Sequence, residues 1–155
     1  MKIAIIAVGQ KLPAWANAAV QDYLARLPRD FPVAMREIRP EPRQGQPIAR
    51  LQSAEAERLR AAVPAGAHLI ALDEKGKDWA TADLALALGQ WRDHCLQPAF
   101  LIGGPDGLDP QLRKQAALCL RLSSMTLPHA LARVVLVEQI YRAWSILHSH
   151  PYHRA

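Results

Sequence analysis

The stretch from Ala99 to Gly107, AFLIGGPDG, decides the fold. Its first four residues are apolar, as in a buried strand, and two adjacent glycines end the run. Paired glycines allow a positive φ and let the backbone approach a flat ligand closely. In an open parallel sheet, ligands bind beyond the carboxyl ends of the strands. The stretch therefore predicts a strand that leads into a binding loop, although the glycines alone fit an ordinary tight turn equally well.

Segments on both sides of this strand alternate between the two kinds of regular structure. Further strands are expected at residues 3–8, 33–38, 68–72 and, as the weakest candidate, 121–123 within a segment that instead fits a continued helix. Helices are expected at residues 14–27, 48–63, 81–94, 110–117 and 130–147. Thr81 and Asp109 are the expected N-caps of the third and fourth helices. This order predicts an α/β fold, a mainly parallel sheet with helices on both faces.

Length and composition bound the organisation of the chain. It has 155 residues, of which 50% are hydrophobic, and this suits a single compact domain over residues 1–155. Cys95 and Cys119 are too few for a disulfide framework and are expected to be small buried hydrophobes. The chain has no apolar leader and no apolar run long enough to cross a bilayer. We therefore expect a soluble, cytoplasmic protein without membrane contact.

The basic residues are unevenly distributed along the chain. The formal net charge is +5, and residues 1–112 are balanced in charge. The segment 113–155 holds six basic residues against one acidic residue, Glu138. Such a surplus favours an anionic partner on the C-terminal third, because neutralising phosphates releases counterions. A solvated basic face is the alternative interpretation.

Three segments share the position expected of a ligand site, at the ends of predicted strands. They are residues 72–76, 103–107 and 122–127. Other chemistries lack their motifs, because neither a dinucleotide fingerprint, nor a phosphate-binding P-loop, nor a G-x-S-x-G nucleophile turn occurs in the sequence. We therefore expect these three segments to form one cleft for a ligand other than a dinucleotide.

The C-terminal segment His148 to Arg154, HSHPYHR, concentrates side chains that carry chemistry. Its three imidazoles suggest metal binding, but no cysteine or carboxylate lies nearby to complete a site. The same residue types stack on bases and bind phosphates, which suits an unpaired RNA loop. A disordered end is the third interpretation, and Pro151 and Tyr152 count against it. No metal site is therefore predicted.

Several short motifs, in this order and spacing, resemble the RlmH-type (YbeA-like) family of SPOUT-class methyltransferases. The resemblance spans the whole chain, and its most specific part is the ending Pro151-Tyr152-His153-Arg154. The other motifs are Val8-Gly9 with Lys11, Leu72-Asp73 with Gly76-Lys77, Leu101 to Leu108, Ser123 to His129, and Tyr141-Arg142-Ala143-Trp144.

The resemblance implies a fold, a cofactor and a substrate that composition and spacing do not supply. It implies a C-terminal trefoil knot, which is otherwise essentially absent from proteins, and a homodimer whose active site the partner chain completes. The implied reaction transfers a methyl group from S-adenosylmethionine to N3 of a pseudouridine in 23S (large-subunit) ribosomal RNA of assembled ribosomes. The implied cofactor-binding residues are Leu72, Gly103, Gly104, Leu122, Ser123, Ser124, Met125, Thr126 and Leu127.

Catalytic roles are assigned to four residues as hypotheses. His153 is the first candidate for handling the N3 proton, and Tyr152 is assigned to stacking or orientation. Arg154 and Arg142 are assigned to phosphate or anion contacts, although Arg142 could equally pair with Glu138 four residues earlier in the last helix. His129, beside the cofactor segment, is a second candidate for the proton, although a structural role fits this histidine equally well. A non-catalytic RNA-binding module with the same fold is the alternative function.

Overall fold

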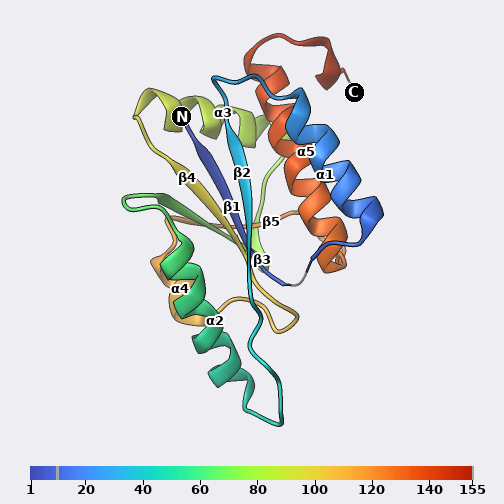
Figure 1. Cartoon of the computed structure of the whole chain (residues 1–155). Coiled ribbons are helices and arrows are strands. Elements are labelled where there is room, and N and C mark those ends of the chain that lie inside the picture. Colours follow the sequence, from blue (N-terminus) through green and yellow to red (C-terminus); the bar gives the residue numbers. More distant parts are fainter. Residues whose placement is uncertain (10, 155) are drawn as a thin grey trace.

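The computed structural model describes residues 1–9 and 11–154, which form one five-stranded sheet with helices around it (Figure 1). The order of the strands is β2-β1-β4-β3-β5, and every pairing between neighbours is parallel. The bounds are β1 Ile3–Val8, β2 Val33–Ile38, β3 His68–Asp78, β4 Pro98–Ile102 and β5 Leu118–Arg121. The parallel sheet expected from the sequence is confirmed.

Helices cover both faces of the sheet, as the alternating pattern predicts (Figure 1). Within residues 1–9 and 11–154, no helix is both long and apolar enough to span a membrane. The helices are α1 Ala14–Arg26, α2 Ile48–Ala62, α3 Thr81–Asp93, α4 Pro110–Gln115 and α5 His129–Leu147, followed by a short 3-10 helix, η1, at Pro151–His153.

The interior strand β1, between β2 and β4, contributes residues to two layers of the core. Alternate residues of a strand point to opposite faces. Ile3 and Ile5 are fully buried in the layer under α1, α3 and α5, whereas Ile6 and Val8 are buried in the layer under α2 and α4. This two-sided burial explains why the strand is an uninterrupted apolar run, without the polar alternation of a half-exposed strand.

Two strand predictions differ from the structure. The fifth strand lies at Leu118–Arg121, not at 121–123, because Leu118 pairs with Ile70 and the buried Leu120 pairs with Leu72 of β3. Strand β3 also continues to Asp78, six residues past the expected end, after its register shifts between Leu72 and Lys77. The irregularity keeps β3 beside β5 while residues 73–76 leave the regular ladder.

The expected N-cap of α3 is also wrong by one residue. Ala80 holds the N-cap position, and the Asp83 carboxylate accepts a hydrogen bond from the Ala80 amide at 2.8 Å. Thr81 instead begins the helix and donates its hydroxyl to Gln139 of α5 at 2.6 Å. Packing against α5 therefore uses the hydroxyl that sequence reasoning assigned to capping.

Candidate active site

Three segments converge on one cleft: the irregular part of β3 that follows Leu72, and the loops that follow β4 and β5. These strands are neighbours in the sheet, and Leu72 of β3 pairs with Ile102 of β4 and with Leu120 of β5. The segment after Leu72 and the loops after β4 and β5 consequently leave the regular strand pairing side by side. They enclose a cleft of about 700 Å³. All nine sequence-predicted cofactor residues line it: Leu72, Gly103, Gly104, Leu122, Ser123, Ser124, Met125, Thr126 and Leu127.

The glycines of the middle loop are required by close backbone packing. A Cβ added to Gly103 would lie 2.7 Å from the carbonyl carbon of Gly107 and 2.8 Å from the amide nitrogen of Leu108, too close for any side chain. The amide of Gly107 donates to the carbonyl of Gly104 at 2.9 Å, which closes the loop on itself. The turn interpretation and the binding-loop interpretation are therefore compatible, because this tight turn lines the cleft.

Charged and polar groups surround the apolar floor of the cleft. The Asp73 carboxylate accepts hydrogen bonds from the Lys75 amide at 2.9 Å and from Arg113 at 3.3 Å. On the third loop, the Ser123 hydroxyl accepts the amide of Met125 at 2.9 Å, and the Met125 side chain is 77% exposed. An exposed methionine at the mouth of an apolar cleft provides adaptable contact area.

His129, the first residue of α5, ties the glycine loop to the longest helix. Its Nε2 lies 2.5 Å from the carbonyl oxygen of Gly103. Burial is the main cause that lowers the pKa of His129, and the positive charge of Arg133 lowers it further, while the hydrogen bond to Gly103 partly opposes both. The ring is therefore neutral at neutral pH, and its Nε2 donates to the carbonyl.

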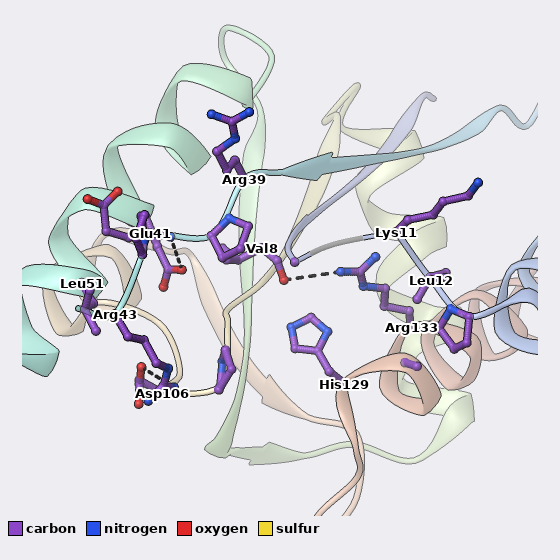
Figure 2. A pocket seen from close by; sticks show the side chains of 17 residues that line it. Val8, Lys11, Leu12, Arg39, Glu41, Arg43, Leu51, Asp106, His129 and Arg133 are labelled. Carbon is purple, nitrogen blue, oxygen red and sulfur yellow. Dashed lines mark hydrogen bonds and ion pairs between the residues drawn. The ribbon is translucent and has the colours of Figure 1, made fainter. Parts of the chain in front are cut away.

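A second hollow of about 1030 Å³ lies beside the cleft, at the carboxyl ends of β1 and β2 (Figure 2). The two cavities share Pro105, Asp106 and His129 as lining residues. In Figure 2, the side chains of His129 and Arg133 lie between the end of β1 and the start of α5. The sequence did not predict this hollow. Two residues that line it, Gly9 and Lys11, nevertheless belong to one of the motifs that carry the family resemblance.

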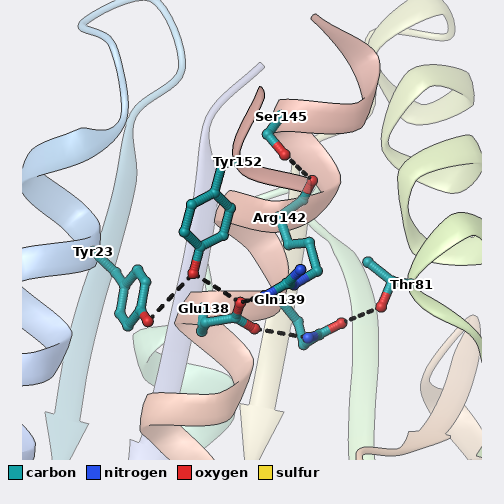
Figure 3. A network of polar contacts seen from close by, with 7 residues as sticks. All are labelled: Tyr23, Thr81, Glu138, Gln139, Arg142, Ser145 and Tyr152. Atoms are coloured by element: carbon teal, nitrogen blue, oxygen red, sulfur yellow. Dashed lines mark hydrogen bonds and ion pairs between the residues drawn. The ribbon is translucent and has the colours of Figure 1, made fainter. Parts of the chain in front are cut away.

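The C-terminal segment packs against α1 and α5 (Figure 3), and none of its described residues lines either cavity. The Tyr152 hydroxyl donates to Glu138 at 3.0 Å, and it also lies 3.3 Å from the Tyr23 hydroxyl of α1. Burial and these hydrogen bonds raise the pKa of the Tyr152 phenol, so it stays neutral. Arg142 pairs with Glu138 at 2.7 Å, with its guanidinium carbon 5.0 Å from the centre of the Tyr152 ring.

None of the four sequence-predicted catalytic residues lines either cavity: His153, Tyr152, Arg154 and Arg142. The cleft lies at the carboxyl ends of the strands, whereas the C-terminus lies near the opposite end of the sheet in Figure 1. The pairing of Arg142 with Glu138, one of the two interpretations of Arg142, is confirmed. In this structure, residues 148–154 therefore do not line the cleft of their own chain.

The described part of the chain contains no group of side chains suited to hold a metal ion. Across residues 1–9 and 11–154, no three histidine, cysteine, aspartate or glutamate side chains gather as a metal site would require. His148 and His150 instead pack against Trp144, with ring centroids at 4.9 and 5.5 Å. Stacking against this partly buried tryptophan explains their place at the end of α5.

Comparison with known families assigns this α/β chain to a class of methyltransferases. Residues 1–153 match the family described as "Predicted SPOUT methyltransferase", and the chain belongs to this SPOUT methyltransferase family. The expected fold class and family are thereby confirmed. The trefoil knot that the family resemblance implies stays a prediction.

Full-length relatives place the chain more closely within the family. The chain is 51% identical to "Ribosomal RNA large subunit methyltransferase H" of Burkholderia vietnamiensis, over 100% of both chains. It is 53% identical to the protein of the same description from Bordetella avium, again over 100% of both. Among solved structures, a methylase-family protein from Neisseria gonorrhoeae covers 90% of this chain and 81% of its own, with a TM-score of 0.51 and 15% identity. That last likeness supports the fold alone.

Proposed function

We propose that this chain uses S-adenosylmethionine to methylate N3 of a pseudouridine in large-subunit ribosomal RNA, acting on assembled ribosomes in the cytoplasm. The observation that carries the proposal is the convergence of three strand-end loops on one cleft of about 700 Å³, lined by all nine expected cofactor residues. The rRNA substrate is supported by the relatives, whose description names that RNA.

The lining of the cleft fits each part of the proposed cofactor. Leu72, Leu122 and Leu127 supply apolar surface for an adenine ring, and the glycine loop lets backbone groups approach it. Asp73 supplies a carboxylate for hydroxyl or ammonium groups, and Arg113 supplies a cation for a carboxylate. When bound, the cofactor would supply an electrophilic methyl group on a sulfonium, and the neutral thioether that leaves when the S–C bond breaks needs no metal to assist it.

The main catalytic contribution of the chain is alignment of the RNA base with the cleft. Holding reacting groups in a near-attack arrangement lowers a barrier by about 7 to 11 kcal/mol in favourable cases. The N3 atom carries a proton that a basic group must accept. His129 is the candidate within the same chain, since it is neutral, lines the cleft, and has an unprotonated Nδ1 when Nε2 donates to Gly103.

A role of the tail, residues 148–155, in the reaction depends on a homodimer. In this chain Tyr152 and Arg142 are held by Glu138, and neither reaches the chain's own cleft. A symmetric pair places the same surface of each chain against its copy, so the tail of one chain can complete the cleft of the other. His153 then remains the candidate for proton handling across the interface, with Arg154 for phosphate contact.

Transfer of a labelled methyl group from S-adenosylmethionine to ribosomes purified from a strain that lacks this enzyme tests the proposal directly. The expected result is one labelled pseudouridine per large-subunit RNA. Ribosomes that remain unlabelled would reject the proposed reaction. Calorimetry with S-adenosylmethionine then distinguishes the alternative, because an RNA-binding module without the cofactor site shows no heat of binding.

A further inference from the structure

The second hollow has no role in the proposed cofactor site or in the proposed action of the tail. Its volume, about 1030 Å³, exceeds that of the cleft, and the two cavities meet at Pro105, Asp106 and His129. A ligand in the hollow would therefore touch residues that also line the cleft. The inference that follows rests on the proposed function, because it assigns the hollow a part in binding the same RNA.

Two exposed cations stand at the rim of the hollow. Lys11 follows β1, and Arg39 follows β2 (Figure 2). A third cation, Arg43, is engaged by the Asp106 carboxylate at 2.9 Å. Arginine and lysine side chains at a cavity mouth are the groups that bind the phosphates of a nucleic-acid strand.

A buried cation lies in the wall of the same hollow. Arg133 of α5 is 1% exposed, and its guanidinium donates to Glu37 at 3.0 Å and to the carbonyl of Val8 at 3.4 Å. In the part of the chain that the structure describes, its Nε has no hydrogen-bond partner. Glu37 therefore pairs with the charge of Arg133, and the Nε–H remains an unused donor in the wall of the hollow.

The interior of the hollow combines apolar walls with one buried acceptor. Pro40, Pro42 and Leu51 provide apolar surface. Glu55 of α2 is 6% exposed and accepts the amide of Glu41 at 3.2 Å. A carboxylate has four lone-pair positions, so Glu55 can accept a further donor from a ligand. Burial is the main cause that raises the pKa of this carboxyl group.

We propose that the hollow binds one nucleotide of the substrate RNA, with its phosphate at Lys11 and Arg39 and its base between the apolar walls. The base donates a ring N–H to the Glu55 carboxylate, which selects a uracil-type or guanine-type edge. An acidic peptide would satisfy the rim cations but would bring further carboxylates toward Glu55. The RNA strand thereby acquires a second anchor beside the base that is methylated.

Variants of the rim and of the buried acceptor test this subsite separately. Arg39→Ala is expected to raise the KM for ribosomes about tenfold while kcat changes little, because one phosphate contact is lost. Arg39→Glu should raise the KM further, because a carboxylate repels the phosphate. Glu55→Gln keeps the shape of the side chain but offers the base a neutral acceptor, so kcat/KM should fall about tenfold. Arg92→Ala removes another exposed arginine, on α3 and outside both cavities, and is the matched control.

Calorimetry with S-adenosylmethionine completes the test, because it reports whether each variant is folded and keeps its cleft. Unchanged cofactor affinity together with a raised KM in the Arg39 variants and a reduced kcat/KM in Glu55→Gln supports the subsite. If the wild-type chain methylates ribosomes and all three variants match Arg92→Ala, the subsite is rejected while the proposed function stands. If the wild-type chain transfers no methyl group, the proposed function itself fails.

Discussion

The Nε2 atom of His129 lies 2.5 Å from the carbonyl oxygen of Gly103, and this contact joins the start of α5 to the end of β4. The two residues are 26 positions apart in the chain. Because a carbonyl can only accept, the hydrogen resides on Nε2 and the neutral ring keeps a lone pair on Nδ1. The contact therefore holds the glycine loop against α5. It also determines which nitrogen of the neutral His129 ring carries the hydrogen.

The first prediction concerns the pH dependence of stability. The pKa of His129 in the folded chain lies below its ordinary value of about 6.5, so the unfolded chain binds more protons in mild acid. The free energy of unfolding should therefore fall as the pH drops below about 6.5, until it reaches the lower folded pKa. His129→Gln should reduce the slope of the free energy of unfolding against pH by up to about 1.4 kcal/mol per pH unit.

Urea unfolding at several pH values between about 5 and 7 measures that slope. The exposed His94 at the end of α3 provides the control variant His94→Gln. A slope in His129→Gln as steep as in the wild-type chain would show that burial of the His129 imidazole does not lower its pKa.

The second prediction concerns the glycine loop. Gly103→Ala places a methyl group 2.7 Å from the carbonyl carbon of Gly107, so the loop must shift. Affinity for S-adenosylmethionine should fall at least about 100-fold, because backbone groups at the floor of the cleft lose their alignment. Isothermal calorimetry measures the loss. Gly89→Ala in α3 serves as the control, since its added methyl meets only the flexible end of Leu147 at 3.3 Å. Equal affinities for S-adenosylmethionine in the two variants would contradict a role of the glycine loop in binding the cofactor.

The fold and the cleft were predictable because they depend on local patterns. Buried strands such as Ile3–Val8 are apolar on both faces, and glycines mark where the chain turns. The convergence of three loops follows from strand adjacency at the carboxyl edge. The continuation of β3 to Asp78 was not predictable, because residues 73–78 are mostly polar and pair with β5 only after a register shift.

The electrostatics could not be predicted from the distribution of charge along the chain. The surplus of basic residues after position 112 suggested a basic face, but Arg113 and Arg121 pair with Asp73 and Asp78. Arg133 is buried and pairs with Glu37, which lies 96 positions away in the sequence. Partners at such separations belong to the fold, and no local signal reports them.

The third prediction concerns the coupling between Gly9 and Arg133. Gly9 has a φ of +153°, and a Cβ there would lie 2.4 Å from an Nη atom of Arg133. Both Gly9→Ala and Arg133→Met should destabilise the chain, the latter by about 2 kcal/mol, since it strips Glu37 and the Val8 carbonyl of a charged donor.

A double-mutant cycle measured by urea unfolding isolates this contact. Once the guanidinium is gone, Gly9→Ala should cost less than in the wild-type chain, because the clash disappears and only the backbone strain remains. Arg36→Met, on the exposed side of β2, controls for the loss of a surface arginine. Strictly additive costs in the cycle would mean that the two residues are not coupled.

The fourth prediction concerns the tail and uses two inactive chains to restore one active site. Deleting residues 151–155 should abolish methyl transfer to ribosomes and leave the affinity for S-adenosylmethionine nearly unchanged, because none of the described residues 151–154 lines the cleft. Gly103→Ala should abolish transfer for the opposite reason, since its tail is intact and its cleft is altered. If a tail serves the cleft of the partner, a hybrid dimer of the two chains contains one complete site.

Co-expression of the two chains in equal amounts should therefore recover roughly a quarter of wild-type activity, because half of the randomly formed dimers are hybrids and each carries one working cleft. The control pairs the tail deletion with a chain that carries both defects, and it should recover nothing. A tail that acted on its own cleft would leave both mixtures inactive, while full activity of the deleted chain alone would remove His153 and Arg154 from the reaction. The contacts of Tyr152 with Glu138 favour recovery, since they hold the tail far from its own cleft.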